Sequence, residues 1–115
     1  MGFLDLFRGK PALIKGTAKI AEGHSKKVDI GDPLAGTGRQ IVLCRVDGAL
    51  YALDGLCPHE GGRISDGPLL GGKLAMCPLH NYQFDPRTGK PVSGMCKDAK
   101  TYRVRERDGD CEIWL

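Results

Sequence analysis

The chain has 115 residues, which is enough for one domain with a modest core and too few for an additional catalytic domain. Its formal net charge is +3, and its basic residues are scattered without interleaved aromatic side chains, so we do not expect nucleic-acid binding. No run of apolar residues approaches the twenty or so that a membrane-spanning helix needs, and the start of the chain does not read as a signal peptide. These observations favour a small cytoplasmic protein.

The chain begins with a short apolar segment. Within Met1–Phe7 the apolar side chains Phe3, Leu4, Leu6 and Phe7 fall close together, which predicts a turn or two of amphipathic helix that ends near Gly9 and Pro11. We therefore divide the chain into an N-terminal segment, residues 1–10, and one domain, residues 11–115.

The first half of this domain is predicted to be a series of short strands. The expected strands are Ile14–Ile20, Lys26–Ile30, Gln40–Val46 and Ala49–Leu53. Asp47-Gly48 predicts a tight hairpin turn, because both residues tolerate positive φ. Alternation places Val42, Cys44 and Val46 on one face, so Cys44 is expected to be a small core residue. The stretch 31–38 is too polar and glycine-rich for a strand.

The second half continues the pattern of strands and turns. Lys73–Met76 and Tyr82–Asp85 are expected to flank a loop, followed by a turn at residues 85–89 and a strand at Lys90–Val92. Thr101–Arg107 and Cys111–Leu115 predict a last hairpin through Asp108-Gly109, with Cys111 facing the core. The fold class is therefore all-β, a small antiparallel sandwich or barrel.

Two short motifs carry the chemistry of this chain. Cys57-Pro58-His59 and Cys77-Pro78-Leu79-His80 each offer one cysteine and one histidine, with seventeen residues between the motifs. Two thiolates and two imidazoles suit either a 2Fe-2S cluster or a structural zinc ion. Zinc fingers generally supply both cysteines before both histidines, so the alternating order favours the cluster. We expect Cys57, His59, Cys77 and His80 to be the metal ligands.

From Ala49 to about Val92 the chain resembles the Rieske ferredoxin family and the related small subunit of cytoplasmic nitrite reductases. The resemblance implies one 2Fe-2S cluster in a subdomain of two ligand loops, within about residues 55–92. It implies that Cys57 and Cys77 hold the inner iron, and His59 and His80 the outer one. Glycines near the loops, such as Gly62, would let backbone groups approach the cluster.

The chain also departs from the high-potential branch of that family. Two disulfide cysteines of that branch would fall at Gly62 and Leu79, and two hydroxyl donors would fall at Tyr82 and Phe84. Phe84 has no donor, and fewer hydrogen bonds to the cluster stabilise its reduced form less. We therefore predict a midpoint potential in the lower part of the Rieske range, which runs roughly from −150 to +300 mV.

The resemblance implies a one-electron carrier and not an enzyme in itself. The expected partner is a redox protein: a flavin reductase, an oxygenase, or a large subunit like that of nitrite reductase. The alternatives are a fixed small subunit of a nitrite-reductase-like complex, a structural zinc domain, and a binding module that responds to redox state. The remaining thiols, Cys44, Cys96 and Cys111, are odd in number, which suits a reducing compartment. We expect Cys96 to be a bystander near the cluster.

Overall fold

The computed structural model describes residues 11–31, 38–58, 62–79, 81–93 and 96–115. All of the strands in these ranges pair antiparallel, in a large sheet of seven and a small sheet of three. The predicted all-β class is thus confirmed. The predicted helix in Met1–Phe7 lies outside the described residues. Within the part of the chain that the structure describes, no helix has the length and apolarity needed to cross a bilayer.

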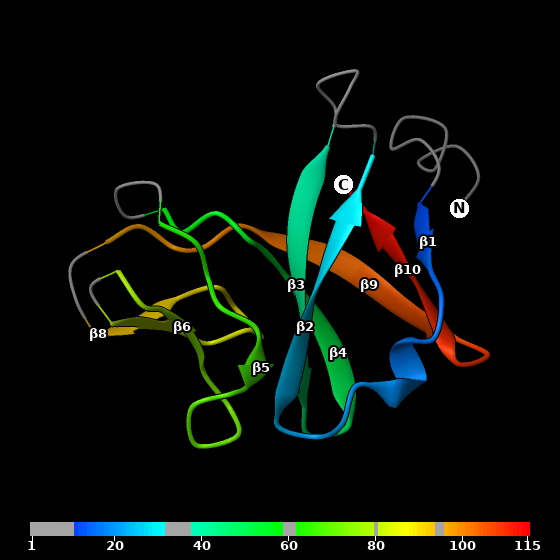
Figure 1. Ribbon diagram of the computed structural model, residues 1–115, viewed down its shortest axis with the longest axis horizontal. Coiled ribbons are helices and arrows are strands. Elements are labelled where there is room, and N and C mark those ends of the chain that lie inside the picture. The colour runs from blue at the N-terminus through cyan, green and yellow to red at the C-terminus, as the bar shows by residue number, and fades with distance from the viewer. Residues whose placement is uncertain (1–10, 32–37, 59–61, 80, 94–95) are drawn as a thin grey trace.

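The large sheet forms the body of the molecule, and the small sheet lies beside it, with β5 between them (Figure 1). The strand order in the large sheet is β1-β10-β9-β4-β3-β2-β5. The bounds of these strands are Ala12–Ile14 (β1), His24–Ile30 (β2), Arg39–Val46 (β3), Ala49–Asp54 (β4), Gly67–Pro68 (β5), Thr101–Arg107 (β9) and Asp110–Trp114 (β10). The small sheet has the order β6-β7-β8, with bounds Ala75–Cys77 (β6), Tyr82–Phe84 (β7) and Pro91–Ser93 (β8).

Both faces of the central hairpin are buried. On one face of β3, Ile41 and Leu43 belong to a core that β9 and β10 also line. On the other face, Val42, Cys44 and Val46 pack in a second core together with residues of the small sheet. The near-continuous burial of β3 follows from this position between two cores. The predicted shared face of Val42, Cys44 and Val46 is confirmed.

Two predicted turns have the expected backbone. Asp47 and Gly48 have φ of 51° and 83°, and Asp108 and Gly109 have φ of 52° and 82°. Positive φ at both central residues is typical of a type I′ turn, and it suits the right-handed twist of a hairpin. The hairpins β3–β4 and β9–β10 therefore form where the sequence predicts them.

The predicted strand Ile14–Ile20 is wrong. The strand β1 ends at Ile14, and a 3₁₀ helix, η1 (Thr17–Lys19), follows. Gly16 has φ 72°, and its N–H donates to the Asp110 carboxylate at 2.8 Å. This contact with a residue 94 positions away turns the chain out of the sheet. The short strand β5 was not anticipated, since its two residues pair with His24 and Ser25 only through the tertiary fold.

Candidate functional site

The first predicted ligand loop begins after β4 and is closed at its base. Leu56 forms an isolated antiparallel bridge with Arg63. Inside this bridge, the Cys57 N–H donates to the carbonyl of Gly62 at 2.7 Å. The side chain of Cys57 is buried. His59 lies outside the described residues. The base of the loop therefore fixes Cys57 at the edge of a core.

The second predicted ligand loop joins β6 to β7. Cys77 is the last residue of β6 and pairs with Tyr82, so four residues form the turn between them. Asn81 has φ 57°, a left-handed conformation that asparagine adopts more readily than most residues. Cys77 is fully buried, and His80 lies outside the described residues. The prediction that Cys77 stands at the end of a strand is confirmed.

The fold brings the two cysteines into the same core cluster. Gly62, whose carbonyl accepts the Cys57 N–H, also contacts Cys77: a β-carbon at position 62 would lie 2.8 Å from the Cys77 Sγ. Below the loops, the N–H and the hydroxyl of Ser65 both donate to the carbonyl of Met76, at 2.9 and 3.0 Å. Backbone and side-chain contacts thus hold the two loops together.

The chemistry of this pair of thiols suits an iron-sulfur cluster. Cys57 and Cys77 are two buried soft donors in one core cluster. The glycine at position 62 leaves room beside the Cys77 sulfur that any side chain would fill. Among the described residues, no group of three or more His, Cys, Asp or Glu side chains comes together, and that set omits His59 and His80. The described residues therefore fit the cysteine half of a mixed ligand set.

The other thiols have different surroundings. Burial raises the pKa of Cys44 to about 12, and burial is also the main cause that raises the pKa of Cys111. Both thiols stay protonated at neutral pH and pack as core residues, as predicted. Cys96 is partly buried and packs against the core that contains Cys57 and Cys77. Its predicted place near the ligand cysteines is consistent with this contact.

Each ligand loop presents an apolar side chain to solvent. Leu56 stands directly before Cys57, and Leu79 follows Pro78 in the second loop; each is 49% exposed. Single exposed leucines are ordinary, but here one stands within two residues of a predicted ligand cysteine in each loop. These two side chains are therefore available for contact with another protein close to the cysteines.

Sequence reasoning missed a hydrogen-bonded chain at the base of the first loop. The Tyr102 hydroxyl donates to Asp54 Oδ2 at 2.8 Å, and Asp54 Oδ1 accepts the Leu56 N–H at 3.0 Å. Arg39 donates to the Tyr102 hydroxyl oxygen at 3.3 Å. Burial is the main cause that raises the pKa of Tyr102, and the bond to Asp54 adds to it. A polar Asp54 directly before Gly55 was the one sequence signal for this arrangement.

Comparison with known proteins gives the following similarities in sequence. The sequence model of the Rieske [2Fe-2S] domain matches residues 15–103. The ferredoxin component of the naphthalene 1,2-dioxygenase/salicylate 5-hydroxylase systems of Ralstonia sp is 46% identical over 69 residues, which are 59% of this chain and 65% of that protein. The ferredoxin component of the naphthalene 1,2-dioxygenase system of Pseudomonas putida is 42% identical over 78 residues, 65% of this chain and 74% of that protein.

Solved structures share the fold. The Sphingomonas yanoikuyae B1 ferredoxin has a TM-score of 0.71 and 26% identity, over 91% of this chain and 98% of that one. The ferredoxin of carbazole 1,9a-dioxygenase from Nocardioides aromaticivorans IC177 has a TM-score of 0.76 and 22% identity, over 92% of this chain and 98% of that one. The fold of this chain therefore agrees with these structures over the whole arrangement of strands, and not only at the predicted ligand loops.

Proposed function

This chain belongs to the Rieske [2Fe-2S] family and is therefore an electron-transfer protein with one 2Fe-2S cluster, and on that premise we propose that it serves as the ferredoxin component of an oxygenase system. It would accept one electron from a reductase and pass it to a terminal oxygenase. The ferredoxin components of naphthalene dioxygenase systems, at 42–46% identity, support this role.

We further propose that Cys57, His59, Cys77 and His80 are the cluster ligands. The burial of both cysteines in one core and the space beside Gly62 support the cysteine half of this assignment. When bound, the cluster supplies a centre that takes up and releases a single electron. Cys57 and Cys77 would anchor it, and the closed loop bases would hold both thiols in place before assembly.

The partner is proposed to approach over the two ligand loops. Leu56 and Leu79 are exposed beside the cysteines, so they offer apolar contact area around the point of electron exit. A weak interface of this kind suits a carrier that must leave one protein and find another. The observation that carries the proposal is the juxtaposition of two buried cysteines with the exposed side chains of Leu56 and Leu79.

The first test is spectroscopic. We expect the purified, dithionite-reduced protein to give the rhombic low-temperature EPR signal of a histidine-ligated cluster, with two irons and two sulfides per chain and no zinc. Cys57→Ser and Cys77→Ser should each lose the signal, whereas the matched variant Cys96→Ser should keep it. One tightly held zinc without sulfide would overturn the proposal in favour of a structural metal site.

The second test is electron delivery. Stopped-flow mixing of the reduced protein with the oxidised oxygenase component of the Ralstonia naphthalene 1,2-dioxygenase system should oxidise its cluster, and the visible absorbance that the cluster loses on reduction should return at a rate that rises with oxygenase concentration. Bovine serum albumin in place of the oxygenase serves as the control. A loaded protein that reduces no such oxygenase and purifies with a large reductase subunit would instead indicate the nitrite-reductase-like alternative.

A further inference from the structure

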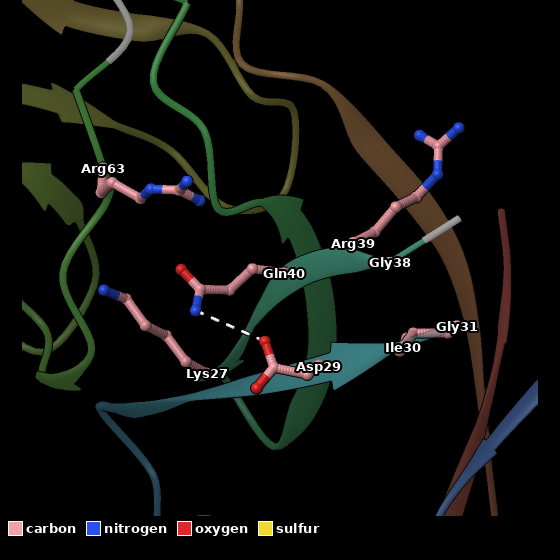
Figure 2. Close-up of a pocket in the computed structure, with 8 residues that line it drawn as sticks. All are labelled: Lys27, Asp29, Ile30, Gly31, Gly38, Arg39, Gln40 and Arg63. Atoms are coloured by element: carbon pink, nitrogen blue, oxygen red, sulfur yellow. Dashed lines mark hydrogen bonds between the residues drawn. The ribbon is translucent and has the colours of Figure 1, made fainter. Parts of the chain in front are cut away.

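A polar cavity opens beside the first ligand loop. Its volume is about 670 Å³, and it lies between the ends of β2 and β3 and the side chain of Arg63. Figure 2 shows Lys27, Asp29, Gln40 and Arg63 gathered on one side of these strands, while Arg39 points away from the group. Three of the charged residues in the lining are cations and one is an anion.

The register of the sheet explains why these side chains converge. Lys27 is paired with Val42, and Asp29 with Gln40, so all four lie on the same face of the β2–β3 hairpin. Val42 belongs to the core that contains Cys57 and Cys77. The cavity therefore lies on the same face of the sheet as the core that contains Cys57 and Cys77.

The cations of the cavity lack acidic partners in the described structure. No ion pair among the described residues includes Lys27 or Arg63. The neighbouring acids are already hydrogen-bonded: Asp29 accepts a bond from the Gln40 amide at 3.5 Å, and Asp66 accepts the Lys27 backbone N–H at 2.9 Å. These bonds leave both carboxylates charged, but Lys27 and Arg63 still outnumber Asp29, the one acid in the lining. The excess of positive charge across a concave surface favours the entry of an anion.

The cavity wall is also the base of the ligand loop. The carbonyl of Gln40 accepts the Gly55 N–H at 2.7 Å, and Arg63 pairs with Leu56 in the bridge that closes the loop. Gly55 is so close to Gln40 that a β-carbon there would lie 2.9 Å from the Gln40 carbonyl oxygen. A group bound in the cavity would therefore lie beside the segment that leads to Cys57.

We propose that this cavity receives the carboxylate of an aspartate or glutamate side chain on the electron-transfer partner. Arg63 offers a planar fork for a carboxylate, Lys27 supplies a second positive charge, and the Gln40 amide retains one N–H beyond its bond to Asp29. Filling the cavity would align the partner with the first ligand loop. This inference rests on the proposed electron-carrier function, because that function supplies the partner.

A peptide titration tests the cavity without any partner protein. The ¹⁵N-labelled, oxidised, cluster-loaded protein is titrated at low ionic strength with N-acetylated, C-amidated hexaglutamate. We expect saturable shifts of the Gly38, Gln40 and Arg63 backbone amides, which are absent with hexaglutamine and suppressed by 0.5 M salt. Binding of hexaglutamine to the same amides, or no shift with hexaglutamate, would overturn the proposal.

Charge-matched variants localise the binding. Lys27→Gln/Arg63→Gln should weaken hexaglutamate binding at least fivefold, whereas Lys19→Gln/Arg107→Gln, which removes the same charge elsewhere, should change Kd less than twofold. Equal losses in the two variants would show only a general charge effect and reject the site. Inorganic phosphate is titrated in parallel, and phosphate binding tighter than that of hexaglutamate would identify a pocket for free anions instead of a docking contact.

The stopped-flow reaction with the oxygenase component then tests docking itself. The cavity variant should lower the bimolecular rate constant at least fivefold and flatten its dependence on salt, with an unchanged EPR signal, while the matched variant should remain within twofold of the original protein. An unchanged rate constant in the cavity variant would reject docking through this cavity. If the unaltered protein does not reduce the oxygenase, the proposed function fails, and the peptide titration still decides whether the cavity binds carboxylates.

Discussion

Gly62 is packed against Cys77 so closely that a β-carbon at position 62 would lie 2.8 Å from the Cys77 Sγ. Gly62→Ala should therefore displace the thiol or the first loop, and we expect it to lower the iron and sulfide content per chain. Overpacking of this kind costs about 1–3 kcal/mol of stability. Iron and sulfide analysis together with the intensity of the EPR signal measures the effect.

Gly48→Ala is the control for glycine replacement as such. Gly48 has φ 83° and open space around it, so alanine there brings backbone strain of about 1–2 kcal/mol without any steric contact. We expect Gly48→Ala to keep its full cluster content. Equal iron and sulfide in Gly62→Ala and the unaltered protein would contradict the steric role of Gly62.

The non-ligand thiols should differ in reactivity. A pKa of about 12 for Cys44 leaves a thiolate fraction of roughly 10⁻⁴ at pH 8, and the pKa of Cys111 is also raised. We expect iodoacetamide to modify Cys96 in the native protein and to leave Cys44 and Cys111 intact. Peptide mass mapping reads the sites, with full alkylation in urea as the control. Modification of Cys44 as fast as Cys96 would show that this part of the core opens.

The parts of the fold that were predictable from sequence are those set by local pattern. The alternation along Gln40–Val46 and the turn residues Asp47-Gly48 predict β3 and the hairpin that follows, because a sheet face and a type I′ turn each leave a local signature. The strand predicted at Ile14–Ile20 fails because the bond from Gly16 to Asp110 is long-range. For the same reason, the sequence does not predict the two-residue β5, since its pairing depends on the distant β2.

The candidate site divides in a similar way. The spacing of Cys57 and Cys77 within their motifs points to paired ligand loops, because ligand geometry constrains short spacings in the chain. The contact of Gly62 with Cys77 and the convergence of Lys27 with Arg63 depend on how separate loops and strands pack. No local pattern encodes such contacts, so they emerge only from the three-dimensional structure.

Arg45 links the 3₁₀ helix η1 and the β3–β4 turn to the sheet through hydrogen bonds. Its side chain is 11% exposed, and its guanidinium donates to Glu106 at 2.6 Å and to the carbonyls of Thr17, Ile20 and Gly48. Arg45→Ala would remove all of these hydrogen bonds and the ion pair with Glu106, at a cost of about 3 kcal/mol. We expect the thermal midpoint of the loaded protein to fall by about 10 °C at a fixed scan rate.

Arg45→Lys separates the shape of this side chain from its charge. Lysine keeps the positive charge but replaces the planar fork with a single ammonium group, so we expect it to recover less than half of the lost thermal stability. Glu106→Gln in the Arg45→Ala background should add little further loss, because the two groups interact. Full recovery by lysine would show that charge alone matters at this position.

The bond between Tyr102 and Asp54 makes stability depend on pH at the alkaline end. Burial first, and then the bond to Asp54, raises the pKa of Tyr102, so the folded state favours the neutral phenol. This contribution is fully present below the unfolded tyrosine pKa of about 10 and is lost as pH rises through the higher folded value.

Tyr102→Phe should therefore cost about 1 kcal/mol at pH 8 and progressively less above pH 10, because phenylalanine neither donates to Asp54 nor ionises. Thermal midpoints of both proteins from pH 7 to 11 measure the difference. In a pH titration of phenolate absorbance, Tyr102→Phe should lack one component, whose midpoint in the unaltered protein lies above pH 10. Asp54→Asn tests the same bond from the other side: it keeps an oxygen at the site but removes the charge that opposes ionisation of the phenol, so the pKa of Tyr102 should fall. A difference between Tyr102→Phe and the unaltered protein that stays constant from pH 7 to 11 would contradict the coupling of this bond to the ionisation of Tyr102.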